Sequence, residues 1–209
     1  MLKHARIALE GLSVADALGG FFEFSNLAKA RSRQIPTTTP WHYTDDTNMA
    51  LSIYEILRKH GEINQDALAQ SFADHYDRLR GYGMGARTLI NRIKRGEHWR
   101  DVSHAMFNGS GSYGNGGAMR IAPLGAYFAD DLDVLVDNAR KSVEITHAHE
   151  EGIAGGIAVA VATAFAYRLR DQSPTRRELI DAMLPYIPAS EVKQKCVEAR
   201  DLPDNTTVS

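Results

Sequence analysis

Three adjacent residues with oxygen donors, Thr44, Asp45 and Asp46, are the first candidates for chemistry in this sequence. All three favour the start of a helix, because their side-chain oxygens accept from free backbone N–H groups and the carboxylates lie at the positive end of the helix dipole. Two carboxylates and a hydroxyl also offer the hard oxygen ligands that Mg²⁺ or Ca²⁺ prefers. Taken alone, however, the three residues are more simply explained as an acidic helix cap.

A further acidic candidate, Glu23, stands among the aromatic residues Phe21, Phe22 and Phe24. A carboxyl group in such surroundings either faces solvent at a turn or occupies an apolar pocket, which holds it in the form that a general acid requires. The local sequence favours the solvent-facing position.

Residues 108–117 contain five glycines and lead into a helix that we predict over 118–124, with Pro123 in an early turn. A glycine-rich loop before a helix exposes backbone N–H groups that bind phosphate. A flexible or tightly turning loop explains the same glycines equally well.

His147 and His149 do not form a zinc site, because residues two apart on a helix diverge and neither a Cys nor a further His is placed to complete the ligand set. We expect Thr146 to cap the next helix and one of the two histidines to face a neighbouring element.

Helical periodicity predicts the elements that position these residues. The first helix is expected to end at Gly19-Gly20, where glycine takes a left-handed cap, and a long loop over 25–43 then leads to the acidic pair. The uncharged stretch 152–167 is expected to form a buried central helix. The predicted helices cover residues 2–18, 45–60, 65–79, 86–95, 118–124, 131–145, 151–170, 174–183 and 191–199.

The chain shows neither an internal repeat nor the alternating pattern of β-strands. The fold class is therefore predicted to be all-α, a compact orthogonal bundle of about eight to ten helices. The length of 209 residues suits one domain, 1–209, with its loops gathered at one end.

Composition narrows the classes of partner. The net charge is −2, so no overall charge favours nucleic acid or a membrane surface, although residues 78–100 are locally basic. The first residues lack the apolar core of a signal peptide, and the single cysteine, Cys196, excludes an internal disulfide. We therefore expect a cytoplasmic protein.

The order of the motifs resembles that of the ADP-ribosylglycohydrolase family, the DraG-like ADP-ribosyl hydrolases. The resemblance covers nearly the whole chain, and the run from Ser112 to Arg120 is its most specific part. The motifs are Ala15-Asp16-Ala17-Leu18-Gly19 with Glu23, Tyr43-Thr44-Asp45-Asp46-Thr47, Arg80-Gly81-Tyr82-Gly83, Gly111-Ser112-Tyr113-Gly114-Asn115-Gly116-Gly117-Ala118-Met119-Arg120 and Thr146-His147.

This resemblance implies hydrolysis of the bond between ADP-ribose and a modified protein side chain or small acceptor, assisted by two Mg²⁺ ions. It implies that Thr44, Asp45 and Asp46 bind the metal, with Asp45 and Asp46 also catalytic, and that Glu23 is the acid near the scissile bond. His147 would line the adenosine side. The other implied substrate-binding residues are Gly81, Gly83, Gly111, Ser112, Tyr113, Gly114 and Asn115.

The sequence departs from the family at its end. The family completes its metal site with an Asp-x-Asp-Thr or Asp-x-Asp-Ser motif, whereas this sequence stops at 205–209 without one. We therefore expect a domain that is C-terminally incomplete relative to the family and that binds one Mg²⁺ or none. The alternatives to a hydrolase are a non-catalytic module that binds ADP-ribose and a structural protein with the same fold.

Overall fold

The structure is all-α over the residues that it describes. This computed structural model describes residues 1–23, 34–35, 37, 39–203 and 206. These residues form ten α-helices and two short 3₁₀ helices without any β-strand among them, which confirms the predicted fold class. The elements are α1 Leu2–Glu23, α3 Asp45–His60, α4 Gln65–Asp74, α5 Met84–Lys94, α6 Trp99–Ala105, η1 Asn115–Gly117, α7 Ala122–Tyr127, α8 Leu132–Glu144, α9 Glu150–Arg168, α10 Arg176–Met183, η2 Leu184–Tyr186 and α11 Glu191–Asp201.

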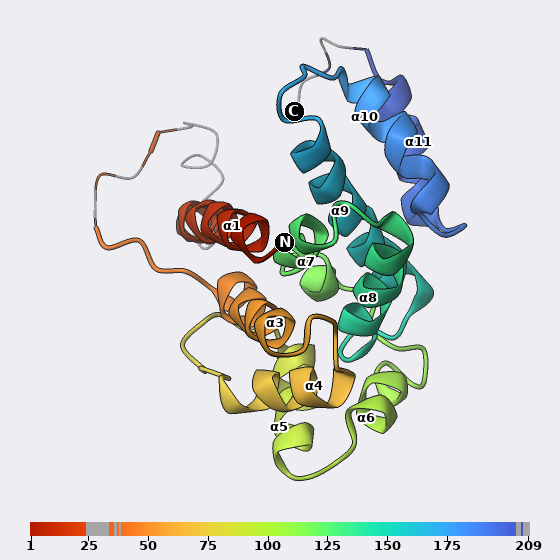
Figure 1. Ribbon diagram of the computed structural model, residues 1–209. Helices are drawn as coiled ribbons and strands as arrows, with labels where there is room; N and C mark the ends of the chain where they lie inside the picture. Colours follow the sequence, from red (N-terminus) through yellow and green to blue (C-terminus); the bar gives the residue numbers. More distant parts are fainter. Residues whose placement is uncertain (24–33, 36, 38, 204–205, 207–209) are drawn as a thin grey trace.

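Helix α9 is the element on which several others converge (Figure 1). It packs against α7, α8, α10 and α11, while α1 packs against α3 and α7 on another side of the molecule. A Cβ atom at Gly125 would collide with the carbonyl oxygen of Ala160, and one at Gly156 would collide with Val143. Small residues at these positions therefore allow α7 and α8 to approach α9 closely.

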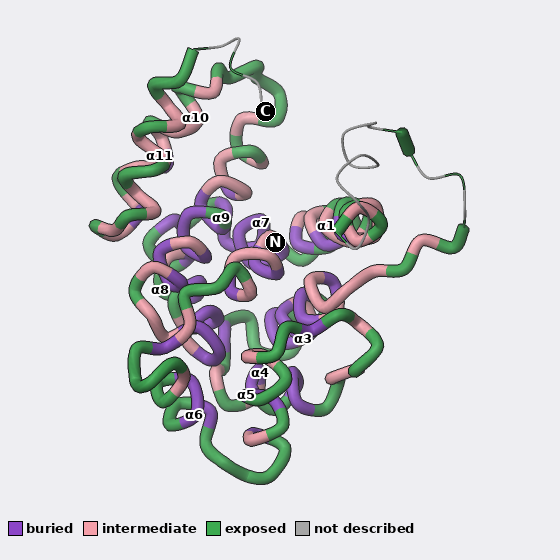
Figure 2. The backbone as a smooth tube through the Cα atoms, turned by 180° about the vertical axis from the view of Figure 1, so that it is seen from behind, coloured by how far each residue is buried: buried purple, intermediate pink, exposed green. Residues whose placement is uncertain are grey.

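Helices from both halves of the chain share one hydrophobic cluster, which extends from Ala5 in α1 to Ile187 after η2. Buried residues gather on α3, α7, α8 and α9, whereas α10 and α11 are mostly exposed or partly buried (Figure 2). The shared cluster favours a single domain, which remains a prediction. Within the described part of the chain, no helix is both long and apolar enough to cross a membrane.

Helix α1 is longer than the sequence predicts. It continues through Gly19 and Gly20 to Glu23, so the predicted end at the glycine pair is wrong. A Cβ atom at Gly20 would lie 3.0 Å from Cγ2 of Thr44. The glycine is therefore explained by the close approach of the segment before α3, and the extra turn carries Glu23 beyond the glycines.

The start of α9 also differs from the prediction, because His149 rather than Thr146 caps the helix. The His149 side chain accepts a hydrogen bond from the backbone N–H of Glu151 at 3.1 Å. Thr146 instead contacts Arg120 through its hydroxyl oxygen, at 2.8 Å.

The structure differs from the predicted elements in two other segments. The helix predicted over 118–124 begins only at Ala122, as α7 with Pro123 in its first turn, and residues 118–121 between η1 and α7 are not helical. Helix α6 is an element that we did not predict. In the predicted loop 25–43 the described residues form no helix, and residues 25–33, 36 and 38 lie outside the described part.

Candidate active site

Asp16 joins α1 to the start of α3. Its Oδ2 atom accepts from the backbone N–H groups of Thr44, at 2.9 Å, and Thr47, at 3.1 Å, and from the Thr47 hydroxyl at 2.6 Å. Its Oδ1 atom accepts from the Thr44 hydroxyl at 2.6 Å. The first free N–H groups of α3 are thus satisfied by a carboxylate from another helix, whereas the Thr44 side chain makes no cap hydrogen bond.

Thr44 and Asp46 line a cavity of about 440 Å³ together with Asp16 and Glu23. Glu23 is exposed, as the sequence favours, yet the last turn of α1 places it on this cavity beside the acidic start of α3. Met119, which follows the glycine-rich segment, also lines the cavity. The structure thus brings together three of the predicted site residues and adds Asp16.

Asp16, Glu23, Asp45 and Asp46 form an acidic cluster, in which the neighbouring carboxylates disfavour the charged forms of Asp45 and Asp46. Burial, together with the charges of Asp46, Asp16 and Glu23, raises the pKa of Asp45 to about 6. Burial and the charges of Asp16 and Glu23 also raise the pKa of Asp46, while a hydrogen bond from Thr44 opposes that rise. A bound cation would relieve this repulsion.

The chemistry of the donors fits Mg²⁺, because Thr44, Asp45 and Asp46 offer only oxygen atoms. The number of these donors fits a Mg²⁺ site less well. Among the described residues, no group of three or more His, Cys, Asp or Glu side chains is arranged to hold a metal ion. These residues therefore supply part of an oxygen-ligand set, and Mg²⁺ binding remains a prediction.

Tyr82 connects the segment 80–83 to α3. Its buried side chain donates from the hydroxyl to Oδ1 of Asn48 at 2.6 Å, and Asn48 lies two residues after Asp46 in the first turn of α3. Gly81 has a φ of 81°, in the left-handed region that glycine favours, and Gly83 immediately precedes α5. Gly81 and Gly83, the two glycines predicted to bind substrate, therefore flank a tyrosine that is hydrogen-bonded to α3.

The glycine-rich segment 108–117 packs closely against the residues before α9. Gly111 has a φ of 73°, and a Cβ atom there would lie 2.6 Å from the backbone nitrogen of His149. A Cβ atom at Gly116 would lie 2.6 Å from Cε1 of His147. At these positions the glycines are explained by tight turning and packing, one of the two explanations that the sequence allows.

The middle of the same segment faces outward. Tyr113 is 71% exposed, and its ring centroid lies 5.3 Å from that of His149. Gly114 and Asn115 are also exposed, and the Gly114 N–H donates to the hydroxyl oxygen of Ser112 at 3.2 Å. This outward part of the segment is the one that a ligand could reach.

Arg120 anchors the segment from inside the protein. Its side chain is fully buried and donates to the carbonyl oxygens of Gly116, at 2.7 Å, and Ser142, at 3.0 Å, and to the Thr146 hydroxyl at 2.8 Å. Burial lowers the pKa of Arg120 to about 9, so the guanidinium remains charged at neutral pH. Within the described part of the chain no carboxylate forms an ion pair with it.

His147 lies beside this anchor and is nearly buried. Its Nδ1 atom is 2.7 Å from the Thr146 hydroxyl oxygen. Burial, with a smaller contribution from the charge of Arg120, lowers the pKa of His147 to about 3. The imidazole is therefore neutral over the physiological range, and its ring lies against the glycine-rich segment.

Neither Asp16 nor Arg120 is among the predicted site residues, although the sequence carries a signal for each. Asp16 follows the helical spacing of the buried residues Ala5 and Leu9, so a carboxylate occupies an otherwise apolar stripe. Arg120 stands directly before the buried Ile121. A charged residue at a buried position indicates that other parts of the fold supply its hydrogen-bond partners.

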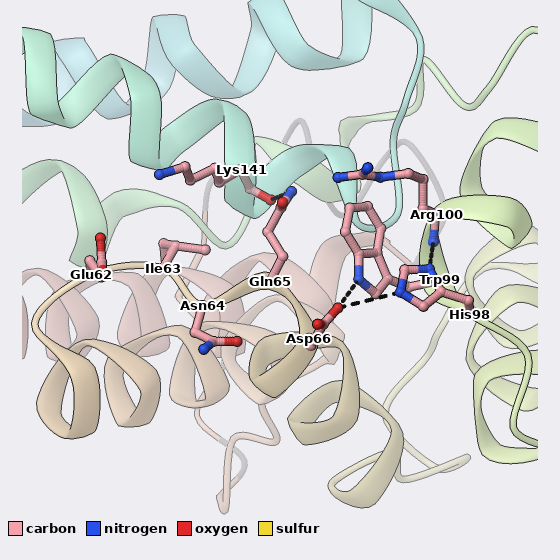
Figure 3. A pocket seen from close by; sticks show the side chains of 9 residues that line it. All are labelled: Glu62, Ile63, Asn64, Gln65, Asp66, His98, Trp99, Arg100 and Lys141. Atoms are coloured by element: carbon pink, nitrogen blue, oxygen red, sulfur yellow. Dashed lines mark hydrogen bonds and ion pairs between the residues drawn. The ribbon is translucent and has the colours of Figure 1, made fainter.

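Another cavity, of about 450 Å³, lies between α4, α6 and α8 and shares no residue with the predicted site (Figure 3). The Asp66 carboxylate accepts from Nε1 of Trp99 at 2.7 Å and lies 3.6 Å from Nε2 of His98. These contacts connect the first turn of α4 to α6. We interpret them as structural.

The chain is similar to curated proteins from animals and bacteria. It is 35% identical to ADP-ribosylhydrolase ARH3 of Homo sapiens over 79% of this chain and 50% of that protein, and 32% identical to ADP-ribosylhydrolase ARH3 of Bos taurus over 96% and 59%. An uncharacterized protein of Escherichia coli, YegU, is 30% identical over 59% of this chain and 37% of its own length. The chain thus spans about half the length of the ARH3 relatives.

The match to a family model covers nearly the whole chain. Residues 1–208 match the family model described as ADP-ribosylglycohydrolase. That range includes the acidic cluster, the glycine-rich segment and the buried Arg120 and His147. The all-α architecture agrees with this match, and the chain belongs to the ADP-ribosylglycohydrolase family.

Proposed function

We propose that this chain takes part in the hydrolysis of ADP-ribose from a modified protein side chain or small acceptor, in a metal-dependent reaction. The observation that carries the proposal is the cavity in which Thr44, Asp46, Asp16 and Glu23 meet. This cavity adjoins, through Met119, the segment whose outward residues would hold the nucleotide. The names of the ARH3 relatives support the same activity.

The proposed metal is Mg²⁺, held by Thr44, Asp45 and Asp46. The donor atoms support this choice, as does the mutual repulsion that raises the pKa of both carboxyl groups. When bound, Mg²⁺ would supply positive charge that orients the ribose hydroxyls and a water molecule. Two Mg²⁺ ions are expected in the family, and one Mg²⁺ in this chain would suit its two carboxylates.

Two residues of the chain would provide proton transfer and positioning. In the reaction the bond from the ribose anomeric carbon to the acceptor breaks, the oxygen of water joins that carbon and the acceptor gains a proton. Glu23 would move this proton, because its carboxyl group is exposed on the cavity and free to approach a ligand. Asp16 would hold Thr44 in place through both its backbone and its hydroxyl.

The test is release of ADP-ribose from modified protein by the variant Asp45→Asn/Asp46→Asn, with Mg²⁺ present. The variant keeps the shape of both side chains but removes their charge. We expect it to lose at least a hundredfold in turnover, since a loss of about 2.7 kcal/mol in transition-state stabilisation corresponds to that factor.

A matched control makes the same change of charge elsewhere. Asp137→Asn/Asp171→Asn alters two exposed carboxylates outside the cavity and is expected to retain full turnover. Wild-type turnover by the Asp45→Asn/Asp46→Asn variant would refute the proposed role of the acidic pair.

A second candidate function is an ADP-ribose-binding module without hydrolytic activity. It is favoured by the incomplete set of metal ligands among the described residues. Calorimetry separates the two functions: a module binds ADP-ribose equally with and without Mg²⁺ and releases no product. If the protein binds no nucleotide at all, a structural role on this fold becomes the better explanation.

A further inference from the structure

Three buried side chains form a chain of hydrogen bonds behind the glycine-rich segment. Nη2 of Arg120 lies 2.8 Å from the hydroxyl oxygen of Thr146, which in turn lies 2.7 Å from Nδ1 of His147. Thr146 is 3% exposed and His147 8%. Water therefore has little access to these atoms, and the protein itself must satisfy their hydrogen bonds.

The direction of the bonds follows from counting protons. A guanidinium can only donate, so the Thr146 oxygen accepts from Arg120. The Thr146 hydroxyl carries one proton, and Nδ1 of His147 is the only acceptor that this proton reaches among the described residues. If Nδ1 were also protonated, two donors would converge on the hydroxyl and its own proton would have no acceptor, at a substantial cost in a buried site.

This arrangement leaves the ring proton on the other nitrogen. Nε2 of His147 would lie 3.5 Å from a Cβ atom at Gly114 and 2.9 Å from one at Gly116, so this edge of the ring faces the glycine-rich segment. Within the described part of the chain the His147 side chain makes its hydrogen bond through Nδ1, and none reaches Nε2. A donor is therefore directed at the segment but is unused by the protein.

We propose that Arg120, acting through the Thr146 hydroxyl, fixes His147 in the tautomer protonated at Nε2 and so presents an N–H donor to an acceptor atom on the nucleoside part of the ligand. Arg120 and Thr146 are positioning residues in this scheme. The tautomer follows from the buried hydrogen bonds alone, whereas the ligand contact rests on the proposed function.

The first experiment is ¹⁵N NMR of histidine-labelled protein at neutral pH without ligand, with the His147 signals assigned by their absence in His147→Gln. We expect Nδ1 to resonate as an unprotonated nitrogen and Nε2 as a protonated one. A protonated Nδ1 in the wild-type protein would overturn the proposal, whatever the variants do.

Two substitutions test the hydroxyl directly. Thr146→Val keeps the shape of the side chain but removes the hydroxyl, so the tautomers should mix and ADP-ribose should bind roughly tenfold more weakly, the effect of one hydrogen bond. Thr146→Ser restores the hydroxyl and should match the wild type in both measurements. We call the chain of hydrogen bonds from Arg120 through the Thr146 hydroxyl to His147 the relay. An unchanged tautomer in a folded Thr146→Val variant would refute this relay.

Ser142→Ala provides a matched control, because the Ser142 hydroxyl is buried beside Arg120 and has no hydrogen-bond partner among the described residues. It should leave both the tautomer and the affinity unchanged. If wild-type protein shows the expected tautomer but binds no ADP-ribose, the proposed function fails and the relay stands. If it releases ADP-ribose from modified protein while Nδ1 is protonated, the hydrogen-bond relay fails and the proposed function stands.

Discussion

Replacing Asp16 tests whether the position of the acidic cluster depends on α1. The Asp16 carboxylate receives four hydrogen bonds from Thr44 and Thr47, two from backbone N–H groups and two from hydroxyls. Asp16→Ala removes every acceptor at once. Asp16→Asn keeps one oxygen, which can remain with the three donors now at Oδ2, while the amide nitrogen replaces Oδ1 and reverses the bond to the Thr44 hydroxyl.

The two variants should differ in size of effect. In Asp16→Ala the backbone N–H groups of Thr44 and Thr47 lose their acceptor at about 1–3 kcal/mol each, so we expect a loss of about 2–6 kcal/mol in the free energy of unfolding. In Asp16→Asn the reversed bond and the lost charge should cost about 1–2 kcal/mol. In both variants the free energy of transition-state stabilisation that is lost, as calculated from turnover, should exceed the loss in the free energy of unfolding, because Thr44 would be less well fixed.

Equilibrium unfolding in urea, monitored by circular dichroism, measures the stability of both variants. If the slope of the free energy of unfolding against urea concentration is unchanged, a shift in the midpoint reports a change in stability. Glu10→Ala is the control on the same helix, since Glu10 is exposed and, among the described residues, pairs with Arg6; its midpoint should match the wild type. An Asp16→Ala variant within about 1 kcal/mol of the wild type would refute the reasoning, because the N–H groups would then have another acceptor.

Three other changes have definite expected outcomes. Gly116→Ala should destabilise the protein by about 1–3 kcal/mol in urea unfolding, because its Cβ would lie 2.6 Å from Cε1 of His147, whereas Gly155→Ala, with open space around it, should be neutral or stabilising. Tyr82→Phe should cost about 1 kcal/mol by the same measurement, since the bond to Asn48 is lost. The folded-state pKa of His147, about 3, is below its ordinary 6.5, so stability is full above pH 6.5 and falls as pH decreases toward 3. Between pH 7.5 and 5 the wild type should therefore lose about 2 kcal/mol more than His147→Gln in urea titrations, and equal losses would contradict the buried neutral state.

The parts of the fold that the sequence predicts are those governed by local rules. The end of α3 at Gly61, which has a φ of 75°, follows from neighbouring residues alone, whereas the N–H groups at the start of α3 are satisfied by Asp16 from α1. Asn64 caps α4 and Asp131 caps α8, each through its own side chain. The starts of α4 and α8 are confirmed because the contacts that stabilise them lie within a few residues along the chain, but α4 ends at Asp74 and not at residue 79 as predicted.

The sequence was least informative where the partners are distant along the chain. Asp16 bonds to residues about thirty positions away, and Arg120 bonds to the carbonyl of Ser142 and the hydroxyl of Thr146. The sequence shows only that a charged residue stands among apolar ones. Thr146 was wrongly predicted to cap α9 for the same reason, because a distant guanidinium engages its hydroxyl instead.

The glycine-rich segment shows why composition alone leaves its function open. Gly111 and Gly116 have no room for a Cβ atom, so the packing of the fold accounts for them without any ligand. Tyr113, Gly114 and Asn115 are exposed, and close packing does not explain them in the same way. The hypothesis that this segment binds a nucleotide therefore depends on these outward residues rather than on the number of glycines. A variant such as Tyr113→Ala, which leaves the packed glycines unchanged, is the appropriate change for measuring ADP-ribose affinity.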